Sequence, residues 1–157
     1  MKQLSINNLI NSSTSILLTL LFLCLQLISC EKAPIRSDVE GFWRLERYTV
    51  LSTDETIECN RLYYSITRLV TEVSDKGGNG FGAYIARTGY EDNENTLVLS
   101  DFKVRGGTAD NGKDAPVEGL RNYGINSREE TKFRIIDCDG KTMTLESDYA
   151  CLELRKF

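Results

Sequence analysis

Hydrophobic and polar residues alternate along the second half of this 157-residue chain, with a period of two. The alternation is clearest in three pairs: Phe133 and Ile135, Met143 and Leu145, and Leu152 and Leu154. A period of two is typical of strands that bury one face. No stretch after residue 40 shows the sustained 3.6-residue period of an amphipathic helix. The pattern therefore predicts an all-β domain.

Clusters of Gly, Asn and Asp divide the domain into expected strands. The strands run over residues 41–51, 56–59, 62–73, 81–90, 96–103, 129–136, 142–146 and 149–156. Short hairpin turns join most of them, so the prediction is an antiparallel meander of seven or eight strands. A meander that closes into a small barrel leaves no unpaired sheet edge.

Residues 105–125 form an unusually long predicted loop, rich in Gly, Asp and Asn. Loops of this length often act as lids or contact surfaces. The stretch 119–124 (GLRNYG) gives this loop apolar and aromatic side chains with which to contact another surface. It can equally pack over one end of a barrel.

The N-terminal region has a different pattern. Its 13-residue apolar run, Ile16–Ile28, follows a polar stretch whose one charge is Lys2. A bilayer-crossing helix needs roughly 18–20 apolar residues. A charged start followed by a short apolar run is typical of a secretory signal. Residues 1–29 are therefore expected to be a signal peptide.

A cysteine stands directly after this run. Leu27-Ile28-Ser29-Cys30 resembles the lipobox of bacterial lipoproteins, in which the cysteine carries diacylglycerol and becomes the mature N-terminus. Two or more acyl chains anchor a protein stably without a spanning helix. The resemblance implies a lipidated Cys30, a short tether over residues 30–39, a domain over residues 40–157, and a location in the cell envelope, at the outer membrane. The alternatives are a secreted protein in which Cys30 is incidental, and an uncleaved anchor.

The absence of histidine from the sequence changes the functional picture. It removes the usual general base near neutral pH, every Ser-His-Asp triad and most zinc sites. After removal of residues 1–29, 18 basic and 23 acidic residues remain, and no basic cluster stands out. Nucleic-acid binding depends on neutralising phosphates, so it is not expected. The prediction is a protein without catalytic activity, cofactor or metal.

Two further groups of residues are ambiguous. Cys59, Cys138 and Cys151 remain after processing, so either one disulfide forms or all three are buried free thiols. The loop 110–114 (DNGKD), with Glu118, gathers oxygen ligands of the kind that Ca²⁺ prefers. Its spacing does not fit the EF-hand loop and its lysine opposes a cation, so a solvated turn is expected.

Gly41-Phe42-Trp43 resembles the G-x-W motif in the first strand of lipocalins, and the likeness extends loosely over residues 39–157. Together with the lipobox, the chain resembles the lipocalin-like (calycin-type) domain of small Bacteroidota lipoproteins. The resemblance implies a barrel with Trp43 at its closed end, covered by Arg155 near the C-terminus. The helix that follows the last lipocalin strand has no counterpart before Phe157, which favours a shortened relative.

Candidate binding residues lie on neighbouring expected strands. Arg68 shares a predicted strand face with Tyr64, and Tyr84 follows on the next strand. If these side chains face inward, the Arg68 guanidinium matches a ligand carboxylate; the alternative is that Arg68 faces solvent. The lipocalin resemblance then implies binding of a small apolar or amphipathic molecule such as a fatty acid. The competing hypothesis is a filled barrel whose long loop binds a partner in a cell-envelope complex.

Overall fold

The structure, a computed structural model, describes residues 33–157. The expected signal peptide and the lipidation of Cys30 lie outside the described residues. Within residues 33–157, no helix is long and apolar enough to cross a membrane. The folded unit runs from Pro34 to Phe157.

Nine strands and one short helix make up this unit. They are β1 (Gly41–Val50), β2 (Glu55–Ile66), β3 (Val70–Asp75), β4 (Ala83–Glu91), β5 (Thr96–Arg105), β6 (Asp110–Asp114), α2 (Val117–Arg121), β7 (Glu130–Cys138), β8 (Thr142–Glu146) and β9 (Ala150–Lys156).

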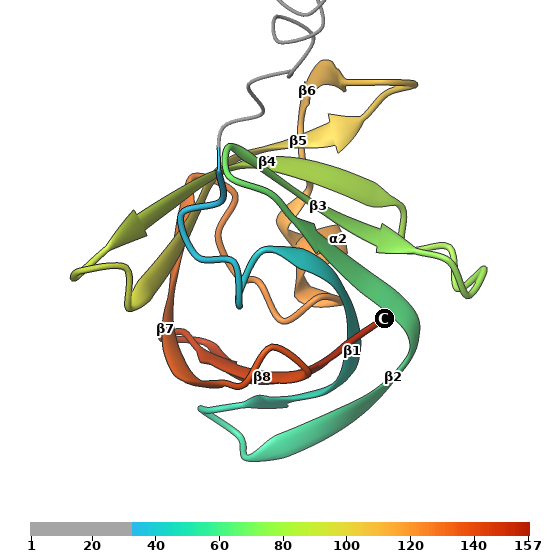
Figure 1. Cartoon of the computed structure of the whole chain (residues 1–157). Helices are drawn as coiled ribbons and strands as arrows, with labels where there is room; N and C mark the ends of the chain where they lie inside the picture. The colour runs from blue at the N-terminus through green and yellow to red at the C-terminus, as the bar shows by residue number, and fades with distance from the viewer. Residues whose placement is uncertain (1–32) are drawn as a thin grey trace, which may run out of the picture. The chain divides into compact units, whose positions relative to one another are not determined.

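The strands form one antiparallel sheet that closes on itself (Figure 1). Its order is β4-β3-β2-β1-β9-β8-β7-β5, and β4 also pairs with β5, which completes a barrel of eight strands. The ninth strand, β6, pairs with β5 and lies outside the closed circle. The expectation of an all-β meander closing into a small barrel is confirmed.

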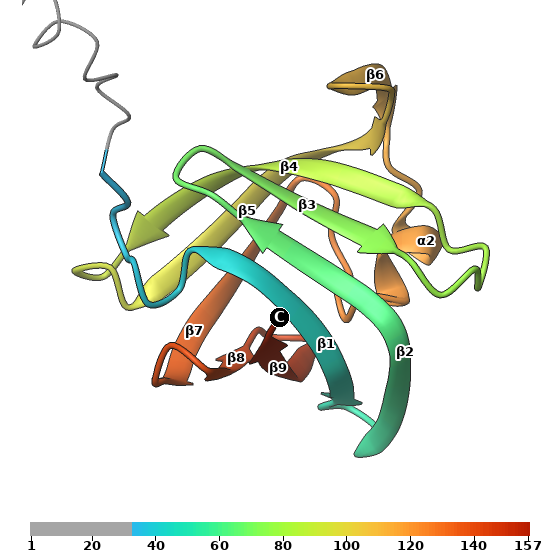
Figure 2. The same ribbon diagram turned by 45° about the vertical axis from the view of Figure 1, so that its right-hand side comes forward.

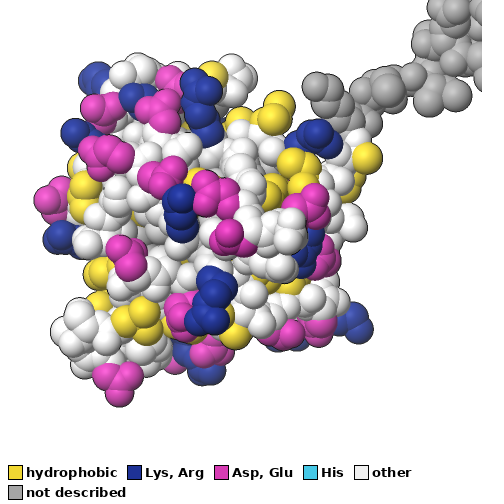
Figure 3. All heavy atoms as spheres, turned by 90° about the vertical axis from the view of Figure 1, so that its left-hand side faces the viewer, with side chains coloured by type: hydrophobic (Ala, Val, Ile, Leu, Met, Phe, Trp, Pro, Cys, Tyr) yellow, Lys and Arg dark blue, Asp and Glu magenta, His cyan; other side chains and the backbone are white. Residues whose placement is uncertain are grey.

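The interior is built from the inward half of the strand alternation. In β9, Leu152 and Leu154 are buried while Glu153 and Arg155 face outward. The largest fully buried side chains include Trp43, Tyr64, Phe102, Tyr123 and Phe133. On the outer face shown in Figure 3, acidic and basic side chains are interspersed, with small groups of hydrophobic atoms between them.

Two predicted segments were wrong in detail. Residues 56–59 and 62–66 belong to one long strand, β2, in which Arg61 takes a positive φ of 56°. The expected strand 62–73 is instead two strands with a turn at residues 67–69. The Thr67 hydroxyl closes this turn, because it donates to the Val70 carbonyl (2.7 Å) and accepts from the Val70 amide (3.3 Å). The strands were predicted to end at clusters of Gly, Asn and Asp, so this turn, which is closed by a threonine, was not recognised.

The barrel has two distinct ends. At the Trp43 end lie residues 34–40 and the turns at 67–69, 92–95 and 139–141, as the strand registers show. At the α2 end lie the turns at 51–54, 76–82 and 147–149 and the connection 106–129. Figure 2 shows α2 on the opposite side of the barrel from the start of β1. The candidate sites follow this division.

Candidate functional site

At the Trp43 end, the indole is fully buried and its Nε1 donates to the Val39 carbonyl at 2.7 Å. Lys156 covers the ring, with Nζ 4.9 Å from its centroid. The expectation that Arg155 would cover Trp43 was wrong by one residue. Trp43 and Lys156 are cross-strand partners, and the alternation of β9 turns Arg155 to solvent.

Gly41 makes room for this arrangement. A Cβ at this position would lie 2.8 Å from Cε of Lys156, and the glycine has a φ of +149°. The first residue of the G-x-W motif therefore lacks a side chain because the lysine stem passes over it. Both the glycine and the lysine have a structural role here.

Residues 34–39, which were expected as part of a tether, pack onto the same end together with Glu40. Arg36 donates to the Glu94 carbonyl at 2.6 Å and forms an ion pair with Asp38 at 2.6 Å. The hydrogen bond from Arg36 lowers the pKa of Asp38 despite its partial burial. Val39 is fully buried. This segment is therefore part of the folded unit and not a free tether.

At the α2 end, the connection between β6 and β7 enters the barrel. Its buried residues are Ala115, Leu120, Tyr123 and Ile125, and we call residues 115–125 the plug. The Ala115 amide donates to the Phe102 carbonyl at 2.9 Å, which fixes the start of the plug. Gly124, three residues after α2 ends, has a φ of +76°, and a side chain there would meet Leu152 at 3.0 Å. The long loop thus packs over one barrel end, one of the outcomes that the sequence left open.

Three tyrosines hold the plug. The Tyr64 hydroxyl donates to the Tyr123 carbonyl, and the Tyr123 hydroxyl donates to the Gly82 carbonyl at 2.6 Å. Tyr84 donates to the Phe81 carbonyl at 3.0 Å, and its ring meets that of Tyr123 edge to face, with centroids 6.1 Å apart. Both hydroxyls are protonated donors at neutral pH, and burial, which raises the pKa of Tyr64 and of Tyr123, keeps them protonated at more alkaline pH.

Of the predicted binding residues, the structure brings together Tyr64 and Tyr84 but not Arg68. The expectation that Arg68 shares a strand face with Tyr64 was wrong, because β2 ends at Ile66 and Arg68 lies half-buried in the turn at the Trp43 end. Sequence reasoning missed Tyr123. The apolar and aromatic stretch 119–124, which contains Tyr123, was noted in the sequence, but nothing in the local pattern shows that this stretch folds into the barrel.

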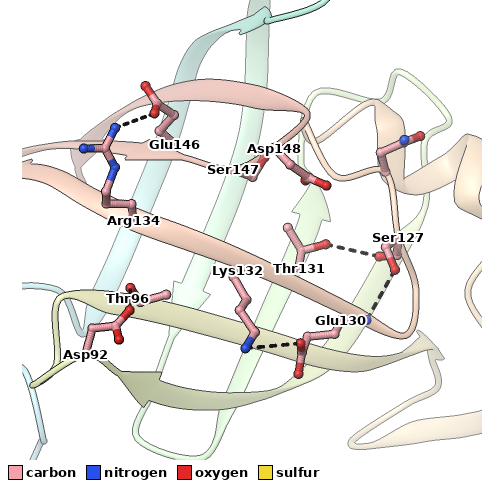
Figure 4. A pocket seen from close by; sticks show the side chains of 11 residues that line it. Asp92, Thr96, Ser127, Glu130, Thr131, Lys132, Arg134, Glu146, Ser147 and Asp148 are labelled. Atoms are coloured by element: carbon pink, nitrogen blue, oxygen red, sulfur yellow. Dashed lines mark hydrogen bonds and ion pairs between the residues drawn. The ribbon is translucent and has the colours of Figure 1, made fainter.

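A polar groove lies in the outer wall, between the first half of β7 and the β8–β9 turn (Figure 4). It arises because β8 ends at Glu146, so β7 has no neighbour on that side near Thr131. The groove has a volume of about 590 Å³. Its charges are largely paired, with Arg134 on Glu146 at 2.6 Å and Lys132 on Glu130 at 3.6 Å. The groove can hydrogen-bond a small polar molecule, but it has no apolar wall.

The remaining ambiguous groups have structural roles. Cys59, Cys138 and Cys151 are half-buried free thiols, and burial raises the pKa of Cys59 to about 12. Asp114, at the end of β6, forms ion pairs with Lys103 at 2.6 Å and Arg128 at 3.6 Å. Among residues 33–157, no group of three or more acidic or cysteine side chains is placed to hold a metal ion.

A closed eight-stranded meander, with a buried tryptophan under a lysine at one end, defines a lipocalin-like barrel. The sequence model of the lipocalin-like domain matches residues 22–157, so the chain belongs to this family. No curated protein is significantly similar to it in sequence. Members of the family are generally not enzymes.

Two solved structures share the fold. A lipocalin-like protein from Bacteroides uniformis is 16% identical, with a TM-score of 0.52 over 76% of this chain and 99% of that one. An uncharacterized protein from Bacteroides eggerthii is 13% identical, with a TM-score of 0.56 over 75% of this chain and 98% of that one. At these identities the likeness extends to the fold alone.

Proposed function

We propose that this protein is a non-catalytic lipoprotein of the cell envelope, held at the outer membrane by lipid on Cys30, that binds a small apolar or amphipathic molecule at the α2 end of its barrel. The observation that carries the proposal is the plug. A segment outside the barrel strands, rather than the sheet itself, fills the mouth of the barrel.

The chemistry of the plug indicates the class of ligand. Leu120, Tyr123 and Ile125 are fully buried at the mouth, next to the rings of Tyr64 and Tyr84. A molecule that takes their place meets an apolar wall with a few hydrogen-bonding groups, namely the Tyr64 hydroxyl and the Gly82 carbonyl. That combination suits an apolar body with one polar end.

Displacing the plug exposes Leu120, Tyr123 and Ile125, so the ligand must bury a comparable apolar surface in their place. The helix of the plug has five residues and no side-chain cap, and a helix this short has little stability of its own. The plug is therefore held by its contacts with the barrel rather than by its own helix, and it can open locally without global unfolding. In this proposal the plug occupies the empty site and leaves it when the ligand enters.

The ligand hypothesis is tested with the full-length protein and a fluorescent fatty-acid analogue, displaced by unlabelled fatty acids and by uncharged amphiphiles. Tyr123→Phe keeps the ring but removes the hydrogen bond from the plug to the Gly82 carbonyl, and it leaves the Tyr64 hydroxyl in place for the ligand. It therefore raises the open fraction of the plug and tightens apparent binding severalfold. Tyr63→Phe, on the outer face of β2, is the matched control and leaves binding unchanged. Absence of saturable binding in the wild type and in Tyr123→Phe would contradict the hypothesis.

The anchor is tested separately. Cys30→Ser releases the protein from the membrane fraction or leaves it unprocessed, because the thioether to lipid cannot form. Mass spectrometry of the mature wild type is expected to detect a lipidated Cys30 at its N-terminus. An unmodified N-terminus at another residue would contradict the anchor.

A second function, a partner-binding module with a solid barrel, is favoured by the packing of the interior. Five of its fully buried side chains are aromatic, from Trp43 at one end to Tyr123 at the other. Under this alternative no amphiphile binds, and the outer surface is the part that functions. In-cell crosslinking from the polar groove on β7 then yields a defined adduct with an envelope protein.

A further inference from the structure

Exposed hydrophobic side chains of the described chain are concentrated at one end of the barrel. Leu69 (66% exposed), Val70 (42%), Ile136 (45%) and Phe157 (77%) all lie toward the Trp43 end. The fifth large exposed hydrophobic residue, Leu51 (46%), lies at the α2 end. The two ends therefore differ in surface character.

Local structure places each of these side chains outside the barrel. Leu69 and Val70 stand in and after the β2–β3 turn, where the Leu69 carbonyl is held by the Thr88 amide at 2.9 Å. The register of β7 on β8 shifts between Ile135 and Asp137, and Ile136 at this bulge is exposed.

The last residue is fixed in the same way. The Phe157 amide donates to the Phe42 carbonyl at 2.9 Å. Its ring packs edge to face on Phe42 and Tyr63, at 5.6 Å from each. Phe157 is thus an ordered apolar side chain held against the outside of the barrel, and most of its surface is left to solvent.

Basic residues accompany the apolar ones. Lys141 and Arg155 are exposed beside β8 and β9, and Arg68 precedes Leu69. Four exposed acidic residues at the same end, Asp92, Glu94, Asp137 and Asp139, offset this charge. The apolar side chains, rather than a net positive charge, are therefore what suits this end to the interface of a membrane.

The short distance along the chain between Cys30 and the folded unit indicates that this surface faces the membrane. Cys30 is four residues before Pro34, where the folded unit begins, and an extended chain of four residues spans at most about 14 Å. Residues 34–40 are fixed to the Trp43 end by Arg36 and by buried Val39. A lipid on Cys30 would therefore hold this end, and not the other, next to the bilayer.

We propose that the Trp43 end is a membrane-contacting surface, in which Leu69, Val70 and Phe157 enter the lipid interface, and that the α2 end faces away from the membrane. This rests on the lipid anchor of the proposed function. It goes beyond it, because an anchor on a free tether would leave the barrel without a fixed orientation. The plugged mouth then opens toward the aqueous phase, away from the lipid.

The test uses the full-length lipidated protein in vesicles of phosphatidylethanolamine and phosphatidylglycerol that contain brominated lipid, which quenches tryptophan on contact. Leu69→Trp and Phe157→Trp each place a reporter on the surface, and Leu51→Trp is the matched control at the other end. The native Trp43 is fully buried and supplies a constant background. Both reporters at the Trp43 end are expected to lose at least a third of their added emission in brominated vesicles. Leu51→Trp loses none.

Flotation of the vesicles separates the two ways of failing. If the wild type does not float with the vesicles, both the lipid anchor and the proposed orientation are contradicted. If it floats, but Leu69→Trp and Phe157→Trp are unquenched or Leu51→Trp is quenched equally, the orientation alone is overturned. Two reporters on different elements keep the result independent of any one substitution that disturbs folding.

Discussion

Lys156 and Arg155 are neighbours in sequence, yet they have opposite environments. Lys156 lies over Trp43 and its ammonium also reaches the Glu40 carbonyl at 3.3 Å. Arg155 is exposed on the outer face of β9. Because strand side chains alternate, the two basic residues cannot share a role. The lysine stem and its cation both contribute to closing the barrel end.

The expected result is that Lys156→Ala lowers the free energy of unfolding by about 0.5–2 kcal/mol, the range for a partly desolvated cation on an aromatic ring. Arg155→Ala changes it by less than about 0.5 kcal/mol, as is usual for surface substitutions. Urea unfolding of both variants is the measurement. An equal loss of unfolding free energy in the two variants would contradict the assignment of Lys156, rather than Arg155, as the residue that covers Trp43.

Trp43 itself is expected to be among the costliest residues to truncate. Trp43→Ala leaves a cavity among fully buried neighbours and lowers the free energy of unfolding by about 3–5 kcal/mol. Trp43→Phe keeps most of the volume but loses the hydrogen bond to Val39, and its cost is smaller. An unchanged urea midpoint for Trp43→Ala would show that the ring does not close the barrel.

At the scale of elements, the plug depends on a close approach between α2 and β4. A Cβ on Gly119 would collide with the Tyr84 hydroxyl and would lie 2.8 Å from the Cζ of that ring. Tyr84 is itself fixed by its bond to the Phe81 carbonyl and by Tyr123. Glycine at position 119 is therefore a packing requirement, separate from any turn.

Gly119→Ala is expected to lower the free energy of unfolding by about 1–3 kcal/mol, the usual cost of overpacking. It is also expected to speed amide hydrogen exchange in residues 115–125 more than in the rest of the barrel. Gly107→Ala is the control, since a Cβ there has no neighbour within 4 Å. A loss of stability without faster exchange in the plug would mean that the contact supports the barrel rather than the plug.

The strand alternation allowed most elements to be predicted from sequence, including β1, β4, β5, β7, β8 and β9. It could not predict β6, whose five residues are all exposed, because that strand exists through backbone pairing with β5 alone. Tyr64 and Tyr84, whose orientation the sequence left open, are both buried in the barrel. Tyr123 was not identified, because the direction in which a long connection folds depends on the barrel around it.

At the scale of the whole molecule, buried phenols and thiols make stability depend on alkaline pH. Burial raises the pKa of Tyr48 to about 12, from an ordinary value of 10.0. It raises that of Cys59 to about 12, from 9.0. Between the ordinary and the raised values the unfolded chain loses protons that the folded chain keeps. The folded state then binds more protons, so the free energy of unfolding falls as pH rises.

The urea midpoint is therefore expected to be unaffected by these groups up to about pH 9 and to decline from there toward pH 12. Tyr48→Phe removes one of them and makes the decline shallower between pH 10 and 12. The comparison is made by urea unfolding at one-unit steps in pH. A variant whose decline is as steep as that of the wild type would show that Tyr48 does not titrate differently in the two states.

The pairing of β1 with β9 sets the order in which the molecule can form. Trp43 lies opposite Lys156, so the seam that closes the barrel joins segments more than a hundred residues apart. All the other neighbouring strands of the barrel follow one another along the chain, except β5 and β7, which are separated by the segment that contains β6 and α2. The hairpins can therefore assemble progressively, but the seam must wait for both of its edges. Since contacts so distant in sequence slow folding, closure of the β1–β9 seam is expected to limit the rate at which the barrel forms.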